Sequence, residues 1–483
     1  MPTPLRTSCR PLLAALALVF VVGVLGPVRP ASALDLSLPD LGTPASETLT
    51  PAEEDRIGQS MMREIRREIT LVTDPAVNAY IRDLGMRIAT ASSMPAEDYR
   101  FFVIDNDRIN AFAMPGGYVG VHSGLITASR NESELGAVIA HEIAHVTQRH
   151  IARRIAAAER AGIRTAAMVL AGLLIGTQNP QAGMAAATTG MASGVDSQLQ
   201  YSRDHEREAD RVGIRILANA RLDPVGMADF FEVLQNDSRY RTEPPPFLST
   251  HPLTGARIAD ARDLARSLAP DAPFESPDHA YVRARLISRS IERVEDAQTR
   301  FAARLEAEPD DPGARYGLAR ALVRAGEHDA AIAQLEGLRA AQGENALIAV
   351  ALAEAELGAG RHTAAIARIN RGLSLFPDNE ALRSVQVDVL LADAKPQKAA
   401  ALTRDLVRVR TDAPELWALH ARASQQAGDE AESILATARF YAVQGDVEAG
   451  LSQLDRLDGL RLTPRQQSRA AALTERWQAQ VQS

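Results

Sequence analysis

The C-terminal half of the chain repeats itself with a period of 34 residues. Gly326 in "RAGEHDAAI" and Gly360 in "GAGRHTAAI" lie one period apart, and the same step leads to Ala394 and then to Gly428. Alanines keep this register five positions after the first three turns: Ala331, Ala365 and Ala399. A small residue recurring at this spacing predicts pairs of helices, joined by tight turns, that stack into a solenoid.

This period resembles that of the tetratricopeptide repeat, whose arrays form a concave groove that binds extended peptides or partner proteins. We therefore expect residues 271–483 to form an all-α repeat solenoid. A turn at Gly445, half a period after Gly428, predicts irregular or capping helices at the end. A helical solenoid without a ligand of its own is the alternative.

The first 33 residues have the pattern of a cleavable secretory signal. Arg6 and Arg10 precede an apolar run over 12–25, and "ASA" at 31–33 fits the small residues of a cleavage site. The run is shorter than the roughly twenty residues that a membrane-spanning helix needs, although an uncleaved anchor is an alternative. We therefore predict export, with the Pro-, Ser- and Thr-rich residues 34–50 as a linker.

Composition excludes several classes of function. The only cysteine, Cys9, lies within the signal, so the exported chain would have neither disulfides nor cysteine catalysis. A net charge of −8 without a basic cluster disfavours nucleic-acid binding. The apolar segment 161–194 has an uncharged core, 166–176, too short for a membrane span. It predicts a buried helix and an Ala/Gly loop, or alternatively a segment that binds a membrane surface or a partner.

Residues 51–270 have the pattern of an α+β domain with a small sheet. We predict helices over 51–68, with Thr50 as N-cap, and over 76–91. The stretches 99–105 and 117–123 have the composition of strands and are separated by "NAFAMPGG".

The motif "HEIAH" begins at His141 and lies on a helix predicted over 132–157. His141 and His145 are one turn apart, on the side roughly opposite the apolar stripe, so both imidazoles can bind one Zn²⁺ ion. Glu142 projects toward a metal-bound water and can take its proton. His150 falls about 180° from His141, which predicts a surface or helix-end residue.

A zinc hydrolase needs a third protein ligand, and "YSRDHEREADRVG" (201–213) offers one. Glu206 and Asp210 share a helical face, from which Glu208 points away. Glu206 would complete a His₂Glu ligand set for one zinc ion per chain, and Asp210 could orient a ligating imidazole. Read alone, this helix would be a solvated charged face.

The motifs "HEIAH" and "SRDHEREAD", with "NAFAMPGGYVGVHSGL" before them, resemble the HtpX/CAAX-prenyl-protease group of zinc metallopeptidases over about residues 50–265. The resemblance implies a zincin-type domain with His141, His145 and Glu206 as zinc ligands and Glu142 as general base. The signal and the repeats narrow it to periplasmic β-barrel-assembly-enhancing proteases of Gram-negative bacteria. The implied partners are unfolded or stalled envelope proteins and the outer-membrane β-barrel assembly machinery, with peripheral membrane association.

The resemblance also raises expectations for other residues. We expect 117–123 to be an edge strand that pairs with an extended peptide, with Asn110 either holding that peptide or capping a turn. His122 is expected to be structural or on the surface, and His205 to point away from the ligand face. His251, in the Pro-rich "EPPPFLSTHPLTGARI", could donate to an oxyanion, block the open zinc position, or be only a loop residue.

Three functions compete at this point. The first is zinc-dependent hydrolysis of misfolded envelope proteins by Glu142 and zinc-bound water. The second is a periplasmic chaperone or assembly factor in which proteolysis is rare or gated. The third, a zinc hydrolase of non-peptide substrates, fits the expected edge strand and repeats less well.

Overall fold

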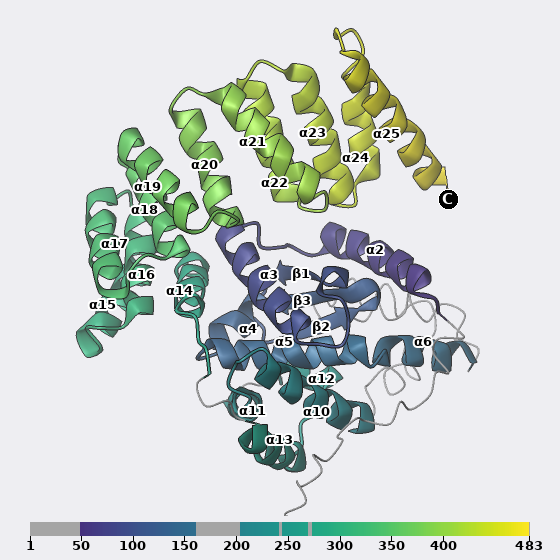
Figure 1. The fold of residues 1–483 in the computed structure, drawn as a ribbon, viewed down its shortest axis with the longest axis vertical. Helices are drawn as coiled ribbons and strands as arrows, with labels where there is room; N and C mark the ends of the chain where they lie inside the picture. The colour runs from purple at the N-terminus through teal and green to yellow at the C-terminus, as the bar shows by residue number, and fades with distance from the viewer. Residues whose placement is uncertain (1–48, 161–202, 241–243, 269–272, 483) are drawn as a thin grey trace, which may run out of the picture. The chain divides into compact units, whose positions relative to one another are not determined.

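The computed structural model describes residues 49–160, 203–240, 244–268 and 273–482 (Figure 1). The predicted signal, all but the last two residues of the predicted linker, and the apolar segment 161–194 lie outside these residues. Within the described ranges, none of the helices combines the length and apolar character needed to cross a membrane.

The described chain begins with an α+β region, as predicted. Its helices are α2 (Pro51–Glu68), α3 (Pro75–Thr90), α4 (Ser123–Ala128), α5 (Glu132–Thr147), α6 (His150–Arg160), α10 (Arg203–Asn219), α11 (Gly226–Tyr240), α12 (Pro246–Thr250) and α13 (Gly255–Leu268). Its strands are β1 (Arg100–Ile104), β2 (Ala111–Met114) and β3 (Tyr118–His122). The predicted N-cap is present, since Thr50 and Glu53 form a reciprocal capping box.

Helices alone make up the rest of the described chain, as the 34-residue period predicted. They are α14 (Asp278–Ser290), α15 (Val294–Ala307), α16 (Pro312–Arg324), α17 (His328–Gln342), α18 (Ala346–Gly358), α19 (His362–Leu375), α20 (Glu380–Ala392), α21 (Pro396–Val409), α22 (Pro414–Gln426), α23 (Glu430–Val443), α24 (Val447–Asp455) and α25 (Pro464–Gln482). Consecutive helices pack together (Figure 1). The four periodic positions have φ of +78° (Gly326), +70° (Gly360), +53° (Ala394) and +81° (Gly428). Each turn therefore uses the left-handed conformation that glycine favours.

The three strands form a sheet in the order β1-β3-β2, with β3 parallel to β1 and antiparallel to β2. The prediction that 117–123 is an edge strand was therefore wrong, because the stretch before Pro115 is a strand and not only a turn. β2 covers the edge of β3, and the outer edge of β2 has no strand partner among the described residues.

The single helix predicted over 132–157 is broken in two. α5 ends at Thr147, and α6 starts at His150 after Arg149, whose φ is +51°. This left-handed residue turns the chain and changes the direction of every side chain beyond it.

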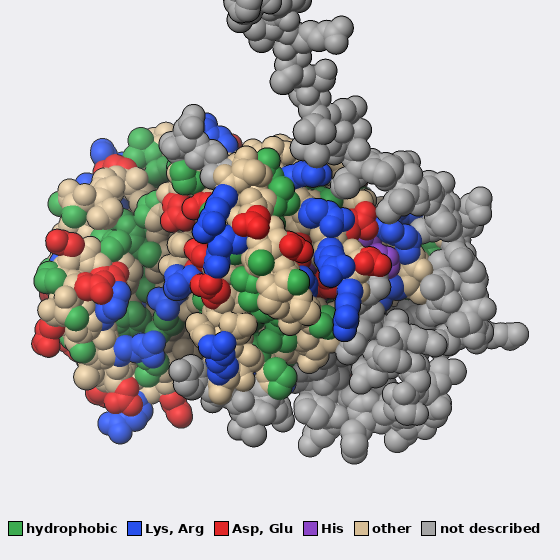
Figure 2. All heavy atoms as spheres, turned by 90° about the horizontal axis from the view of Figure 1, so that it is seen from below, with side chains coloured by type: hydrophobic (Ala, Val, Ile, Leu, Met, Phe, Trp, Pro, Cys, Tyr) green, Lys and Arg blue, Asp and Glu red, His purple; other side chains and the backbone are tan. Residues whose placement is uncertain are grey.

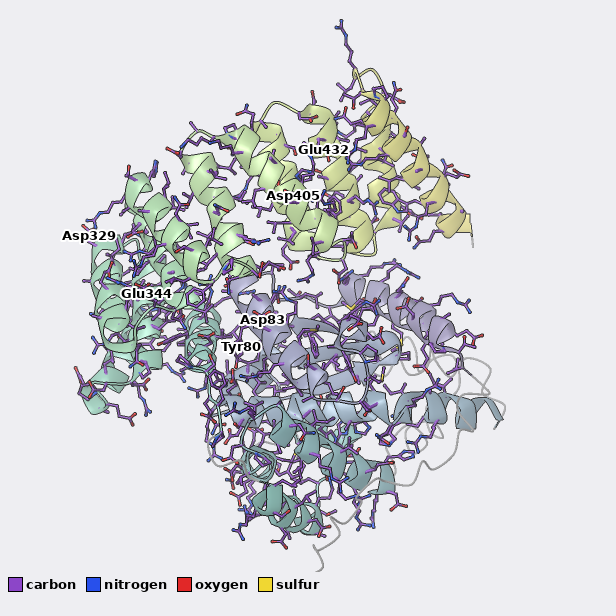
Figure 3. The ribbon with its side chains drawn as sticks, viewed as in Figure 1. Tyr80, Asp83, Asp329, Glu344, Asp405 and Glu432 are labelled. Atoms are coloured by element: carbon purple, nitrogen blue, oxygen red, sulfur yellow. The ribbon has the colours of Figure 1, made fainter. Side chains whose placement is uncertain are left out.

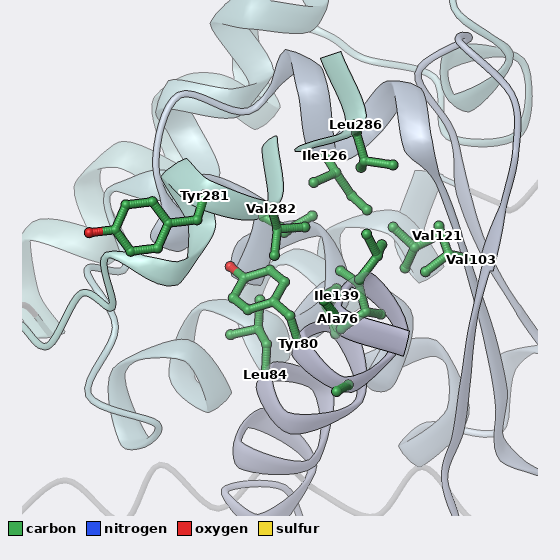
Figure 4. Close-up of a cluster of buried hydrophobic side chains, with 14 of the residues drawn as sticks. Ala76, Tyr80, Leu84, Val103, Val121, Ile126, Ile139, Tyr281, Val282 and Leu286 are labelled. Carbon is green, nitrogen blue, oxygen red and sulfur yellow. The ribbon is translucent and has the colours of Figure 1, made fainter. Parts of the chain in front are cut away.

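The apolar core extends from the sheet to the first repeat helices. Figure 4 shows Val103 of β1 and Val121 of β3 near Ile139 of α5, with Val282 and Leu286 of α14 in the same cluster. α3 also contacts α20, where Arg82 lies 2.7 Å from Glu380. Figure 3 shows Tyr80 and Asp83 on α3 beside these repeat helices.

Candidate metal centre

Two histidines of α5 and a glutamate of α10 converge on one point. α5 and α10 pack closely because Gly213 has no side chain: a Cβ there would lie 3.2 Å from the backbone of Ala140. The Nε2 atoms of His141 and His145 are 3.1 Å apart, and each lies 3.6 Å from a carboxylate oxygen of Glu206. The structure thus gathers the three predicted ligands into one buried cluster.

His251 joins this cluster as a fourth candidate ligand. One ligand atom from each of His141, His145, Glu206 and His251 lies within 4.8 Å of the others. The Nδ1 atom of His251 is 2.9 Å from Glu206 and 3.4 Å from His141. The short helix α12 positions it: His251 caps the helix, and its ring stacks on Phe247 at 4.5 Å.

Asp210 and Arg257 hold the ligands from behind. Asp210 Oδ1 lies 3.0 Å from Nδ1 of His141, opposite the Nε2 that faces the cluster. Arg257 donates two hydrogen bonds of 2.7 Å to Asp210, and its Nη1 lies 2.8 Å from Glu206. It also donates to the carbonyl of Pro252, beside His251. No pattern in the sequence pointed to Arg257, because arginine is a common residue on helices.

Of the two positions predicted for His150, the helix end is confirmed, because His150 begins α6, and the surface is wrong. His150 is buried, and its Nδ1 lies 2.9 Å from Nδ1 of His145. Its Nε2 lies 3.0 Å from Glu208, the glutamate expected to point away from the ligands. The prediction assumed one continuous helix, but the turn at Arg149 redirects His150 toward its neighbour. His145 therefore has a histidine and a carboxylate behind it, as His141 has Asp210.

Glu142 faces the cluster with no hydrogen bond satisfying its carboxylate. Both oxygens are buried without a hydrogen-bond partner, and Oε1 lies 3.5 Å from Nε2 of His251. Burial raises the pKa of Glu142, an effect that the charges of His251 and His141 oppose. A carboxylate in this state readily accepts a proton and returns it.

The cluster favours positive charge. Burial lowers the pKa of His141, but hydrogen bonds from its ring to Asp210 and Glu206 outweigh burial and raise it to about 9. Burial raises the pKa of Glu206, but His251 and His141 bring it well below the usual value. Two buried carboxylates behind a ring of imidazoles thus form a site that attracts a cation.

The remaining candidates lie outside the ligand set. His122 is buried in the sheet, with Nδ1 3.2 Å from the Arg108 carbonyl, which is a structural position. The ring of His205 stacks on that of His150 at 4.5 Å. Asn110 is buried, and its side-chain oxygen has no hydrogen-bond partner, while its carbonyl accepts from the backbone of His122.

Comparison with known proteins extends over both parts of the chain. The sequence model of peptidase family M48 matches residues 75–265, and a tetratricopeptide repeat model matches 292–355. The chain is 33% identical over 447 residues to the beta-barrel assembly-enhancing protease of Escherichia coli strain K12, covering 92% of this chain and 91% of the relative.

The putative beta-barrel assembly-enhancing protease of Vibrio cholerae is 37% identical over 431 residues, covering 88% of each chain. The mitochondrial metalloendopeptidase OMA1 of Schizosaccharomyces pombe is 28% identical over 212 residues, 42% of this chain and 59% of that protein. The two bacterial relatives thus match this chain over most of its length, whereas the mitochondrial relative matches less than half of it.

Proposed function

We propose, from the premise that the chain belongs to peptidase family M48 with C-terminal tetratricopeptide repeats, that it is a zinc endopeptidase of the Gram-negative periplasm. Its substrates would be misfolded or stalled outer-membrane proteins. The observation that carries the proposal is the buried cluster of His141, His145 and Glu206, with Glu142 facing it.

The residues present fit a zinc ion. Imidazole nitrogens and a carboxylate oxygen are ligands that zinc prefers, and Asp210 and His150 supply the outer partners that orient such imidazoles. Glu142 is buried, and no hydrogen bond occupies its two carboxylate oxygens, so they are available to accept a proton from a water bound at this site. A zinc ion bound here would lower the pKa of a ligated water and polarise a peptide carbonyl.

Glu142 would carry the protons of the reaction. It takes a proton from the attacking water and gives it to the leaving amine when the peptide bond breaks. Burial raises its pKa, which makes this carboxylate a stronger proton acceptor than an exposed glutamate. His141, held by Asp210, and His145, held by His150, keep their Nε2 atoms turned toward the cluster.

His251 would keep the resting enzyme latent. A catalytic zinc site has three protein ligands and one open position, whereas a site with four protein ligands is closed. Nδ1 of His251 lies 2.9 Å from Glu206 and 3.4 Å from His141, so His251 would occupy the fourth position of a zinc ion held by the other three ligands. We infer that α12 and His251 must move away before a substrate carbonyl can enter.

Zinc analysis and cleavage of casein test the proposed roles of these residues. The proteins compared are purified wild type and the variants Glu142→Gln, His251→Ala and His141→Ala. Glu142→Gln should keep its zinc and lose at least about 100-fold of its activity, because general-base catalysis supplies that much. Full activity in this variant would refute the base. His251→Ala should cleave faster than wild type if it opens the site. His141→Ala should lower zinc content, and unchanged zinc would refute this ligand.

An extended substrate would pair with β2 rather than β3. β3 is central, while β2 has an outer edge without a strand and packs on α5. All four residues of β2 are buried, so pairing requires the covering segments to open. Replacing the backbone amides of a peptide substrate one at a time with N-methyl amides should slow cleavage at alternate positions, because a paired strand directs alternate N–H groups to its partner. Unchanged cleavage at every position would exclude pairing with β2.

A site closed by His251 would also suit a second function, a chaperone or assembly factor with gated proteolysis. The repeats would then hold envelope proteins or their assembly machinery while the metal centre is silent. Complementation of an envelope defect separates the two functions. Rescue by Glu142→Gln means that binding suffices, and failure of this variant, expressed at the wild-type level, means that cleavage is required.

A further inference from the structure

Arginines line a cavity of about 320 Å³. Its walls come from α2, the starts of β1 and β3, the turn before α22, and helices α23, α24 and α25. The cationic residues are Arg63, Arg66, Arg100, Arg439 and Arg476. Asp412 is the one acidic residue among the described lining residues. None of the four candidate metal ligands lines this cavity.

Three of these arginines lack an anionic partner within the described part of the chain, although the guanidinium of Arg439 lies over the ring of Trp417, 5.6 Å from its centroid. Arg63, Arg439 and Arg476 form no ion pair or hydrogen bond there, and Nε of Arg439 is buried without an acceptor. Arg66 uses two nitrogens on the carbonyls of Val443 and Asp412, and its Nε is also buried without an acceptor. Guanidinium groups therefore gather here with donors to spare.

Neighbouring guanidinium groups repel one another, and such a basic cluster stands out in a chain whose net charge is −8. Burial, and then the charges of Arg476 and Arg469, lower the pKa of Arg439. Elsewhere the chain pairs its arginines: Arg469 lies 2.8 Å from Glu432, which Figure 3 labels among the repeat helices. The face shown in Figure 2 likewise places basic and acidic side chains next to one another. Arg63 and Arg439 are half-buried and Arg476 is exposed, so these cations offer hydrogen-bond donors that suit an anion from outside.

The ligand's class follows from the rest of the lining. A guanidinium fork fits a carboxylate with two hydrogen bonds, and arginine clusters recognise acidic motifs in peptides. Met62, Tyr118 and Trp477 add apolar and aromatic surface beside the arginines, which suits a peptide with mixed side chains more than a bare inorganic ion. A helix of the peptidase region and the last repeat helices meet at this cavity, so an occupant would touch both.

We propose that this cavity binds the carboxylate groups of an acidic peptide segment, at a site separate from the metal centre. The bound segment bridges α2 and the α23–α25 end of the repeats. Such a site selects or anchors acidic segments of a client or partner protein. It does not require cleavage, so it goes beyond the proposed peptidase activity.

Fluorescence anisotropy tests this on the zinc-loaded full chain carrying Glu142→Gln, which prevents cleavage of the probe. The probe is a fluorescein-labelled peptide with four glutamates among alanines and leucines, and its matched control has glutamine at those four positions. The glutamate peptide should bind at least about tenfold more tightly, and salt should weaken it, because charge-assisted bonds carry the affinity. Equal affinities for the two peptides would overturn the proposal.

Arginine variants locate the site. Arg439→Gln with Arg476→Gln should weaken the glutamate peptide at least about tenfold. Arg293→Gln with Arg408→Gln removes the same charge from side chains that are 73% and 76% exposed, and should change affinity less than about twofold. Equal losses in both pairs would mean nonspecific attraction and would overturn the site.

Two further arms complete the test. If Arg439→Gln unfolds the repeats, Arg63→Gln with Arg476→Gln gives the same comparison, since Arg476 is exposed and Arg63 is only half-buried. Inorganic phosphate that displaces the glutamate peptide at equal concentration would reassign the cavity to free phosphate. Because anisotropy reads binding and not cleavage, these results stand whether or not the peptidase proposal holds.

Discussion

Ala394 is the one non-glycine residue among the four periodic turns, and its replacement by glycine should stabilise the repeats. Its φ of +53° lies in the left-handed region, and its side chain is exposed. This conformation destabilises a residue with a Cβ by about 1–2 kcal/mol, whereas glycine adopts it without strain. Glycine also makes the unfolded chain more flexible, which costs about 0.4–1 kcal/mol. The difference predicts that Ala394→Gly raises the unfolding free energy by about 0.5–1 kcal/mol.

The neighbouring turn supplies the reverse substitution. Gly360 has a φ of +70°, and a Cβ built on it meets nothing within 4 Å. Gly360→Ala therefore changes only backbone strain and should lower the unfolding free energy by about 0.5–1 kcal/mol. Ala325→Gly is the control, because Ala325 is exposed at a φ of −77°. There glycine should destabilise by about 0.5–1 kcal/mol.

Tryptophan fluorescence during urea unfolding measures all three variants. The chain has two tryptophans, Trp417 and Trp477, and both lie in the repeat helices, so the signal reports this region. Midpoints should rise for Ala394→Gly and fall for Gly360→Ala, with slopes unchanged. A fall for Ala394→Gly, as in Ala325→Gly, would refute the claim that left-handed strain distinguishes this turn.

Further predictions concern the metal centre and pH. Asp210→Asn should lower zinc affinity about 10- to 100-fold, because it weakens the acceptor that orients His141; competition with a chelator measures this, and unchanged affinity would contradict it. His150→Phe should lower zinc affinity about tenfold in the same assay while keeping the buried ring, and an unchanged affinity would make the contact with His145 incidental. Burial lowers the pKa of His279 to about 3, against about 6.5 when unfolded, so its contribution to stability is present above pH 6.5 and is lost as pH falls below that value. The free energy of unfolding in urea should therefore fall between pH 7 and pH 5 by about 2 kcal/mol more in wild type than in His279→Gln. Equal falls in the two proteins would rule out this residue as the cause.

Local patterns made several features of the protein predictable. The 34-residue period located the left-handed turns at Gly326, Gly360, Ala394 and Gly428, since a period reports which positions share one backbone environment, but it did not locate Gly343, whose φ is +85°. The spacing of His141 and His145 placed both on one helical face, because four residues make about one turn. The capping box at Thr50 is likewise encoded within a few residues.

The order of strands in the sheet and the turn of the chain at Arg149 could not be predicted from local patterns. A strand's own residues do not tell whether it lies at the edge or the centre of a sheet, and β3 became central because β2 formed from a stretch that looked like a turn. His150 was misplaced because one left-handed residue, Arg149, ended the helix on which the angle was counted.

Short stretches of the chain specify the available chemistry: two imidazoles one turn apart, a neighbouring carboxylate, a second acidic helix and a regular array of turns. Which groups stand behind the ligands depends instead on how distant segments pack. Arg257 reaches Asp210 and Glu206, and His150 reaches His145, through contacts that depend on how separate helices pack. The physical reason is range: helical periodicity is fixed by bonds within a few residues, whereas these contacts depend on burial of the whole domain.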